Sequence, residues 1–300
     1  MQNIIKRSDC PACNSNSIHP VLEAEDFTVS HEKFSVWQCD NCTLRFTQNV
    51  PAENAIGRYY QSSDYVSHSD TKSGLINRLY HIVRNYTLQT KRKLVQKVTG
   101  IEKGSLLDIG AGTGAFAFTM QQAGWQVKGL EPDAIARQNA LSNHHIQLES
   151  LDALPSLNTN TFDAITLWHV LEHVHELHNY LQTFNRILKD NGTLIIAVPN
   201  YTSYDADAYK EFWAAYDVPR HLYHFSPKSM QLLMQQHGFT VAAHKPMWFD
   251  SFYVSMLSEK YKTGKNNLVK AVSTGMQSNR KAMNDTTKCS SVIYVIKKKK

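Results

Sequence analysis

The sequence lacks any long hydrophobic run. No apolar stretch approaches the ~20 residues that a membrane-spanning helix requires, and the opening residues MQNIIKR contain no signal-peptide core. Low-complexity sequence is also absent before the final four lysines. We therefore expect a cytoplasmic protein without a membrane partner, in which 300 residues form one large domain or two smaller ones.

A strong excess of one charge is also missing. The 32 lysines and arginines barely outnumber the 26 acidic residues, and residues 297–300 supply four of the six net positive charges. A protein that binds nucleic acid usually carries a strongly basic face. The charge therefore argues against a nucleic-acid partner without excluding one, and it leaves the oligomeric state open.

Cysteine is scarce, but four of the five cysteines form two C-x-x-C pairs on either side of residues 14–38. The four are Cys10, Cys13, Cys39 and Cys42. Two such pairs fit one tetrahedral zinc site with a structural role, because four thiolates leave no open coordination position. Two disulfides are the alternative, which the cytosol disfavours, and a single redox pair would not need a second copy. Cys289 is expected to be an ordinary thiol.

Three segments are predicted along the chain. Residues 1–50 form a zinc ribbon, which is too small to fold without its metal. Residues 51–100 form a helical linker with a long helix over 73–99. Three tyrosines lie in this linker, Tyr59, Tyr60 and Tyr65. Residues 101–300 form the main domain.

Glycine is sparse, yet three glycines fall close together at Gly110, Gly112 and Gly114. The apolar run before them predicts a buried parallel strand, and residues 115–123 predict a helix, so the glycines form the turn of a βαβ unit. Glycine lets a ligand lie directly on the backbone. The next predicted strand ends at Glu131, where a carboxylate can accept hydrogen bonds from both hydroxyls of a ribose.

The glycines alone fit two families. Gly110, Gly112 and Ala115 also match the G-x-G-x-x-G/A pattern of nicotinamide enzymes. The surrounding residues decide: residues 108–114, DIGAGTG, resemble motif I of class I S-adenosylmethionine (SAM) methyltransferases, and residues 162–174 resemble the motif IV region of the same family. With its ribbon, the chain resembles bacterial zinc-ribbon methyltransferases of type 11, 12 or 23 that act on sugars and other small molecules.

The resemblance implies an α/β fold, a doubly wound Rossmann-like sheet of seven strands with an antiparallel last strand. Insertions are expected at about 201–225 and 246–288, the second forming a lid or a dimer surface. The segment before motif I often folds over the substrate in such enzymes, so the linker 51–100 is expected to contribute a substrate lid. Its tyrosines, Tyr59, Tyr60 and Tyr65, either line the substrate pocket or pack ordinarily. The expected strands are 106–109, 125–130, 146–148, 162–167, 194–198, 239–244 and 292–296.

The resemblance also implies the residues that bind SAM. They are Asp108, Gly110, Ala111, Gly112, Gly114, Glu131, Pro132, Ser150, Leu151, Trp168 and His169. Ser150 stands where the family often has an acid that accepts from the adenine amino group, and a serine accepts more weakly. Trp168 and His169 are expected to surround the methionine part.

A second stretch, residues 217–225 (DVPRHLYHF), resembles a P-R-H-L-x-H-F run of zinc-ribbon and type-12-like bacterial methyltransferases. Histidine titrates near neutral pH, so His221 or His224 is a candidate general base. Arg220 can clamp a carboxylate or phosphate of the acceptor. The alternative is that the run only orders its own loop.

Histidines also gather after the fourth predicted strand, at His169, His173, His175 and His178. A metal site among them is conceivable, but members of the family carry this H-V-L-E-H run without a metal. We expect Glu172 and His173 to make structural contacts near a helix start.

The sequence therefore predicts a SAM-dependent methyltransferase that contains zinc and methylates an oxygen or carbon of a small molecule, such as a sugar or a phenol or quinone-like compound. One alternative is an rRNA base methyltransferase. Another, of a different class, is a non-catalytic SAM-fold binding module. The acceptor itself is not identified.

Overall fold

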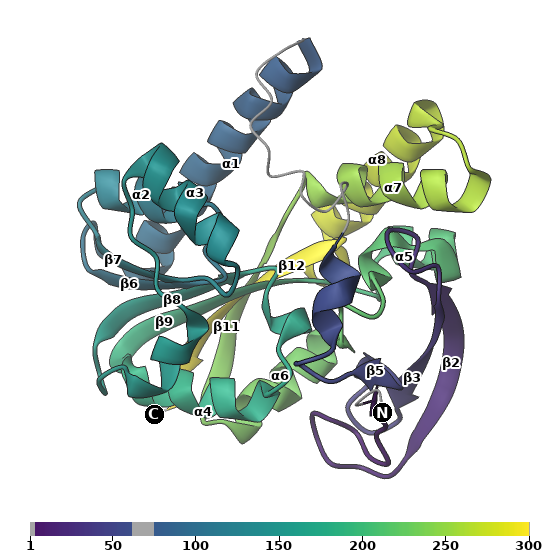
Figure 1. Ribbon diagram of the computed structural model, residues 1–300, viewed down its shortest axis with the longest axis horizontal. Coiled ribbons are helices and arrows are strands. Elements are labelled where there is room, and N and C mark those ends of the chain that lie inside the picture. Colours follow the sequence, from purple (N-terminus) through teal and green to yellow (C-terminus); the bar gives the residue numbers. More distant parts are fainter. Residues whose placement is uncertain (1–3, 62–74, 300) are drawn as a thin grey trace. The chain divides into compact units, whose positions relative to one another are not determined.

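The structure of the chain is a computed structural model that describes residues 4–61 and 75–299, with side chains from residue 83 onward in the second stretch (Figure 1). Tyr65 and the first residues of the predicted helix 73–99 lie outside the described residues. The described chain divides into two compact units. The first comprises the described residues up to 61, His169–Asn179 and Ala197–Tyr294; the second comprises the described residues from 75 to 168, Tyr180–Ile196 and the residues from Val295.

The first unit contains the cysteine-rich N-terminal region. Its strands are β1 (Ile4–Ile5), β2 (Ile18–Glu25), β3 (Lys33–Cys39), β4 (Arg45–Thr47) and β5 (Val50–Pro51). β1 pairs with β5, and β2 and β3 form the long hairpin visible in Figure 1. The sheet of β2, β3 and β4 gains a fourth strand from far along the chain, β10 (Tyr223–His224), which pairs antiparallel with β4.

The rest of the first unit is largely helical. Its helices are η1 (Ile56–Tyr60), η3 (Leu171–His173), α5 (Tyr204–Tyr209), η4 (Lys210–Phe212), η5 (Ala214–Tyr216), α6 (Pro227–Gln236), α7 (Asp250–Thr263), α8 (Leu268–Asn284) and η6 (Thr286–Lys288). α6 begins with a capping box between Ser226 and Ser229. The segment predicted as an insertion at 246–288 contains α7 and α8. The two helices pack so closely at Gly275 that a Cβ there would lie 2.7 Å from the Phe252 ring.

A six-stranded sheet has the order β11-β12-β9-β8-β6-β7. The strands are β6 (Ser105–Ile109), β7 (Gln126–Leu130), β8 (Phe162–Trp168), β9 (Leu188–Pro199), β11 (Phe239–Pro246) and β12 (Ser291–Lys298). β6 pairs in parallel with β7 and with β8. β12 runs antiparallel to β9, because Asn200 N donates to Ser290 O (2.8 Å) near one end and Lys297 Nζ to Thr193 Oγ1 (2.6 Å) near the other. The doubly wound fold with an antiparallel last strand is confirmed.

The predicted count of seven strands is wrong, because residues 146–148 do not form a strand. Only an isolated bridge joins Glu149 to Leu130, with Glu149 N donating to Gly129 O (3.0 Å) and Glu131 N to Glu149 O (2.9 Å). His145 ends the preceding helix in a left-handed conformation, and Ser150 already caps the next 3-10 helix. Too few residues remain between these two caps to extend the pairing.

The second unit also contains α-helices and a 3-10 helix. They are α1 (Leu75–Thr99), α2 (Ala115–Gln122), α3 (Ala134–His144), η2 (Leu151–Ser156) and α4 (Leu177–Ile187), the last of which begins in the first unit. Gly100, with φ +74°, ends α1, and Asp133 caps α3. Within the described residues, no helix has both the length and the apolar character needed to cross a membrane.

Candidate functional site

The glycine-rich loop between β6 and α2 has the backbone that its sequence requires. Gly110, Gly112 and Gly114 all have positive φ, at 65°, 53° and 77°. A Cβ on Gly114 would lie 2.9 Å from the Cβ of Ala140, so this position also needs glycine for space. A Cβ on Gly112 would meet no atom of the described residues within 4 Å. The loop therefore presents its backbone to open space at Gly112, where a ligand can lie.

Glu131 holds this loop from the end of β7. Its Oε2 accepts from the Gly112 N–H (2.7 Å), and its Oε1 accepts from the Asp133 N–H (3.0 Å). Burial raises the pKa of Glu131, and the two N–H donors act in the opposite direction. Each carboxylate oxygen has a second lone pair, so the side chain can still accept from hydroxyl groups of a ligand.

Asp108 lies inside the sheet and is fully buried. Its Oδ1 accepts from Thr166 Oγ1 (2.6 Å), so that the carboxyl joins β6 to β8 beneath the glycine loop. Burial raises the pKa of Asp108 to about 7. In the structure, Asp108 links two strands through its hydrogen bond with Thr166. A direct contact of Asp108 with a cofactor stays a prediction.

Trp168, the last residue of β8, carries a buried indole N–H without a hydrogen-bond partner in the part of the chain that the structure describes. Its ring packs edge-on against Phe116, with 5.4 Å between ring centroids, and Lys91 Nζ lies 4.3 Å from its ring centroid. An unpartnered buried donor costs about 1–3 kcal/mol. This N–H is therefore a candidate donor to a ligand.

The remaining residues predicted to contact the cofactor lie in the loops of the second unit. Ser150 caps η2 and donates its hydroxyl to Asp152 Oδ2 (2.8 Å), and Leu151 follows it half-buried. Pro132 is exposed, and its carbonyl accepts from Arg137 Nη1 (2.7 Å). Contacts of these three residues with adenine or ribose stay predictions.

The four cysteines of the two C-x-x-C pairs come together in the first unit. Their sulfur atoms all lie within 4.8 Å of one another, with 3.4 Å from Cys10 Sγ to Cys42 Sγ and 3.6 Å from Cys13 Sγ to Cys39 Sγ. A tetrahedral zinc ion with Zn–S bonds of about 2.3 Å separates its sulfurs by roughly 3.8 Å. The cluster therefore fits the predicted zinc site in ligand number and spacing.

Arg220 is buried in the first unit and uses its guanidinium within the protein. Nη2 donates to Asp26 Oδ1 (2.9 Å) and to Asp217 Oδ1 (2.6 Å), and Nη1 donates to Tyr59 O (2.8 Å). Burial opposes the charge, but the two carboxylates raise the pKa of Arg220 further. These contacts favour a positioning role that joins the ribbon to the loop 217–225. The clamp on an acceptor anion stays a prediction.

The two histidines of this loop differ in their surroundings. His224 is buried, with its Nε2 3.0 Å from Thr47 Oγ1, and burial together with the charge of His221 lowers its pKa well below the usual value. His221 directs Nδ1 at Ala215 O (2.9 Å) and packs edge-on against His173, with 4.6 Å between ring centroids. The Nε2 atom of His221 can therefore still accept a proton. His224 instead contacts Thr47 of the ribbon.

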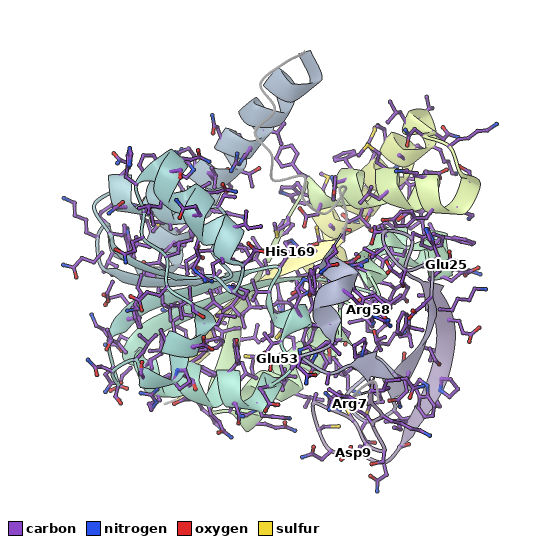
Figure 2. The ribbon with its side chains drawn as sticks, in the orientation of Figure 1. Arg7, Asp9, Glu25, Glu53, Arg58 and His169 are labelled. Carbon is purple, nitrogen blue, oxygen red and sulfur yellow. The ribbon has the colours of Figure 1, made fainter. Side chains whose placement is uncertain are left out.

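His169, labelled in Figure 2, directly follows β8 with a left-handed φ of 58°. Its Nε2 lies 2.9 Å from Asp250 Oδ2 and its Nδ1 3.4 Å from Glu172 Oε1. Burial lowers the pKa of His169, but the two carboxylates outweigh it and raise the pKa to about 10. Strained backbone of this kind is enriched at functional sites. The predicted place of His169 beside the methionine part of a cofactor stays a prediction.

The structure brings together three residues that were not predicted to form a group. Glu172, His173 and His221 each offer one ligand atom, all within 4.8 Å of one another. The H-x-x-E-H spacing was a signal for Glu172 and His173, but their partner His221 lies in another loop. Only the fold joins them.

A cavity of about 700 Å³ in the first unit is lined by β2, by Arg45 of β4 and by residues 201–216. The Arg45 guanidinium lies 4.1 Å from the Tyr201 ring centroid and donates to the Tyr216 hydroxyl (2.8 Å). The volume of this cavity is that of a small-molecule site. No sequence pattern indicated this cavity, because its walls come from segments far apart along the chain.

Comparison with known proteins follows the same features. A family model described as a methyltransferase domain matches residues 81–244. A ubiquinone biosynthesis O-methyltransferase of Glaesserella parasuis is 36% identical over 118 residues, which are 36% of this chain and 50% of that protein. The mitochondrial protein of the same name from Rattus norvegicus is 26% identical over 165 residues, 49% of this chain and 47% of that protein. The chain thus spans about half the length of the curated relatives it matches.

Among solved structures, a candidate sarcosine dimethylglycine methyltransferase from Galdieria sulphuraria superposes with a TM-score of 0.50 and 14% identity. The match covers 74% of this chain and 88% of that protein. At this identity the likeness concerns the fold alone.

Proposed function

Because this chain belongs to the family of proteins with a methyltransferase domain, we propose that it transfers the methyl group of SAM to an oxygen or carbon atom of a small molecule. The main support for the proposal is the geometry of the glycine loop. Glu131 accepts a hydrogen bond from the Gly112 N–H, and the backbone of Gly112 borders open space. SAM supplies an activated methyl group on a sulfonium that leaves readily. The protein has to bind it, align the acceptor and manage the acceptor's proton.

The described residues fit SAM in several places. The backbone of Gly110, Ala111, Gly112 and Gly114 would border the amino-acid and ribose parts, and Glu131 would accept from the ribose hydroxyls. Ser150 and Leu151, with Pro132, would border the nucleoside. The unpartnered indole N–H of Trp168 would donate to the methionine part, next to His169. Asp108 would hold β6 and β8 in the register that the loop needs.

A hydroxyl acceptor must lose its proton as its oxygen bonds to the methyl carbon and the sulfonium C–S bond breaks. We assign this proton to His221, which can accept at Nε2 because Nδ1 faces the Ala215 carbonyl. Arg220 and His224 would position the loop, since their polar atoms contact Asp26 and Thr47 of the ribbon.

The relatives named for ubiquinone biosynthesis favour oxygen as the accepting atom and a phenol or quinone-like ring as the acceptor. A sugar hydroxyl has the same chemical need for proton removal. The zinc ion proposed for the four cysteines would be structural, because the four thiolates complete its coordination.

Isothermal titration calorimetry tests the cofactor half of the proposal. The wild type should bind SAM and its demethylated product with a dissociation constant of the order of micromolar, and Glu131→Ala should bind both at least ~10-fold more weakly. Glu149→Gln, at an exposed carboxylate paired with Lys128, is the matched control and should bind as the wild type.

Tighter binding of NADH than of SAM would refute the family assignment of the cofactor. Equal SAM affinity in wild type and Glu131→Ala would remove Glu131 from the ribose contact. SAM binding without transfer to any of a panel of phenols, quinols and sugars would instead favour a binding module.

A further inference from the structure

Glu172 is the most unusual charged residue of the first unit. Its side chain is 0% exposed, and neither of its carboxylate oxygens has a hydrogen-bond partner among the residues that the structure describes. Burying an unpaired carboxylate is costly. His169 Nδ1 offsets part of the charge at 3.4 Å from Oε1, but the opposite nitrogen of the same ring lies closer to Asp250, at 2.9 Å. Room therefore remains for a further positive partner.

Two histidines beside Glu172 are oriented as metal ligands usually are. His173 directs Nδ1 at Arg220 O (3.0 Å), and His221 directs Nδ1 at Ala215 O (2.9 Å). A carbonyl can only accept, so each Nδ1 carries the proton and each Nε2 keeps a lone pair. Metal-binding histidines typically donate their second nitrogen to a carbonyl or carboxylate, which fixes the tautomer and the ring.

The surroundings of the cluster are rich in carboxylates. Asp217 Oδ2 lies 3.9 Å from His221 Nε2, and Asp250 Oδ2 lies 2.9 Å from His169 Nε2, on the ring that faces Glu172. Nearby carboxylates attract a cation.

We propose that Glu172, His173 and His221 bind a divalent first-row transition-metal ion. The three ligand atoms lie within 4.8 Å of one another, as ligands of one ion must. Two imidazoles and one carboxylate suit zinc, manganese or iron, whereas magnesium and calcium prefer oxygen ligands throughout. Three protein ligands leave coordination positions open, unlike the four cysteines of the ribbon.

Such an ion would use the lone pair of His221 Nε2, so His221 would act as the base only in the metal-free protein. With the ion bound, an acceptor hydroxyl would take an open coordination position and release its proton to water, because a metal ion lowers the pKa of a bound oxygen. Binding of the ion does not depend on the proposed methyl transfer. Its test therefore needs neither SAM nor an acceptor.

Manganese(II) provides a selective probe, because it prefers nitrogen and oxygen ligands to thiolates. The full-length protein with its ribbon zinc is titrated with Mn²⁺, and the fall of the free-ion electron paramagnetic resonance signal reports binding. We expect one Mn²⁺ per chain in the wild type and at least ~10-fold weaker binding in Glu172→Gln and His173→Gln, since even outer partners of a metal are worth 10–100-fold.

His175→Gln is the matched control, because His175 lies in the same segment but bonds to the Pro51 carbonyl outside the cluster. It should bind Mn²⁺ as the wild type does. A separate sample, incubated with excess zinc and then dialysed, gives a second readout, with two zinc ions per chain in the wild type and one in Glu172→Gln. Thermal unfolding identifies any variant that fails to fold, in which case the other ligand variant decides.

Either of two results would overturn the proposal. The first is a wild type that binds no Mn²⁺ at millimolar concentration and holds only one zinc ion. The second is a folded Glu172→Gln that binds both ions as the wild type does. Neither result would affect SAM binding, which is measured separately.

Discussion

At the scale of single residues, His221 is distinguished from its neighbours by having one nitrogen committed and one free. Nδ1 faces the Ala215 carbonyl, and Nε2 lies 3.9 Å from Asp217 Oδ2. His224, three residues further on, instead lies against Thr47 of the ribbon. The loop therefore assigns different tasks to two histidines that the sequence alone leaves equivalent.

His221→Ala should lower turnover by about 10²- to 10⁴-fold, the usual contribution of a general base, while SAM affinity stays nearly unchanged. The measurement is steady-state methyl transfer together with calorimetry for SAM. His244→Gln in β11 is the matched control and should keep full activity. Unchanged turnover in His221→Ala would show that another group handles the acceptor's proton.

The Asp26–Arg220 ion pair makes a second prediction, on pH. Burial raises the pKa of Asp26, but hydrogen bonds from Ser30 and Arg220 outweigh it and lower the pKa from 3.8 to about 2. Because the pKa of Asp26 is lower in the folded than in the unfolded protein, its ionised carboxylate stabilises the fold at any pH above the unfolded-state pKa. This stabilisation is lost as the pH falls from about 4 to about 2. The shift corresponds to about 2 kcal/mol.

Asp26→Asn should therefore unfold more easily than the wild type at pH 7, and the difference should shrink as the pH falls through that window. Urea unfolding at pH 7, 4 and 2.5 measures it, with Asp40→Asn, at a half-exposed carboxylate near His19, as the control. A difference that does not vary with pH would contradict the assigned pKa.

At the scale of elements, the ribbon is continuous with a later part of the chain. β10 pairs with β4, Tyr201 Oη donates to Thr43 O, and Thr43 Oγ1 lies 2.7 Å from Ser226 Oγ. Each contact joins the N-terminal strands to residues 201–226. Loss of the ribbon's metal should therefore be felt well beyond residue 50.

Removing zinc with a chelator should loosen β2, β3, β4 and also β10, and leave β6, β7 and β8 protected. Hydrogen–deuterium exchange measures this directly, because amides of a loosened strand exchange faster. Restoring zinc should restore protection in all four ribbon strands. Full protection of β10 in the chelated protein would mean that this strand does not depend on the metal site.

Local sequence patterns predicted the elements that depend on neighbouring residues. The glycine turn, the strand before it and Glu131 at the end of β7 follow from residues within one βαβ unit, and the structure has each of them. The third strand was wrong because two caps, at His145 and Ser150, compete with pairing. A two-residue strand such as β10 has no pattern of its own, because its partner strand determines it.

The candidate site divides in the same way. The four cysteines lie in two short motifs, so their meeting was predictable from spacing. The meeting of Glu172 and His173 with His221 was not, because no local pattern relates a helical turn after β8 to a distant loop. The burial of Arg220 could not be predicted either, because an arginine in a polar segment is normally exposed. Its burial depends on the two carboxylates that accept from it, Asp26 and Asp217, and Asp26 lies far away in the sequence.

At the scale of the whole molecule, the chain is divided between two units that it enters more than once. The first unit includes the ribbon, His169–Asn179 and Ala197–Tyr294, so β9 and β12 each belong partly to both units. The division of the sequence into 1–50, 51–100 and 101–300 stays a prediction about sequence segments. Compactness in space groups those segments differently.

The pairing of β4 with β10 has a consequence for synthesis. Thr47 and His224, which meet in that sheet, are 177 residues apart. At ~5–20 residues per second, a ribosome needs roughly ten to thirty seconds to make the strand that closes the ribbon's edge. During that interval the nascent ribbon can capture zinc but exposes an unpaired strand edge, which is a template for wrong pairing. The ribbon's first strands thus leave the ribosome long before the strand that completes their sheet.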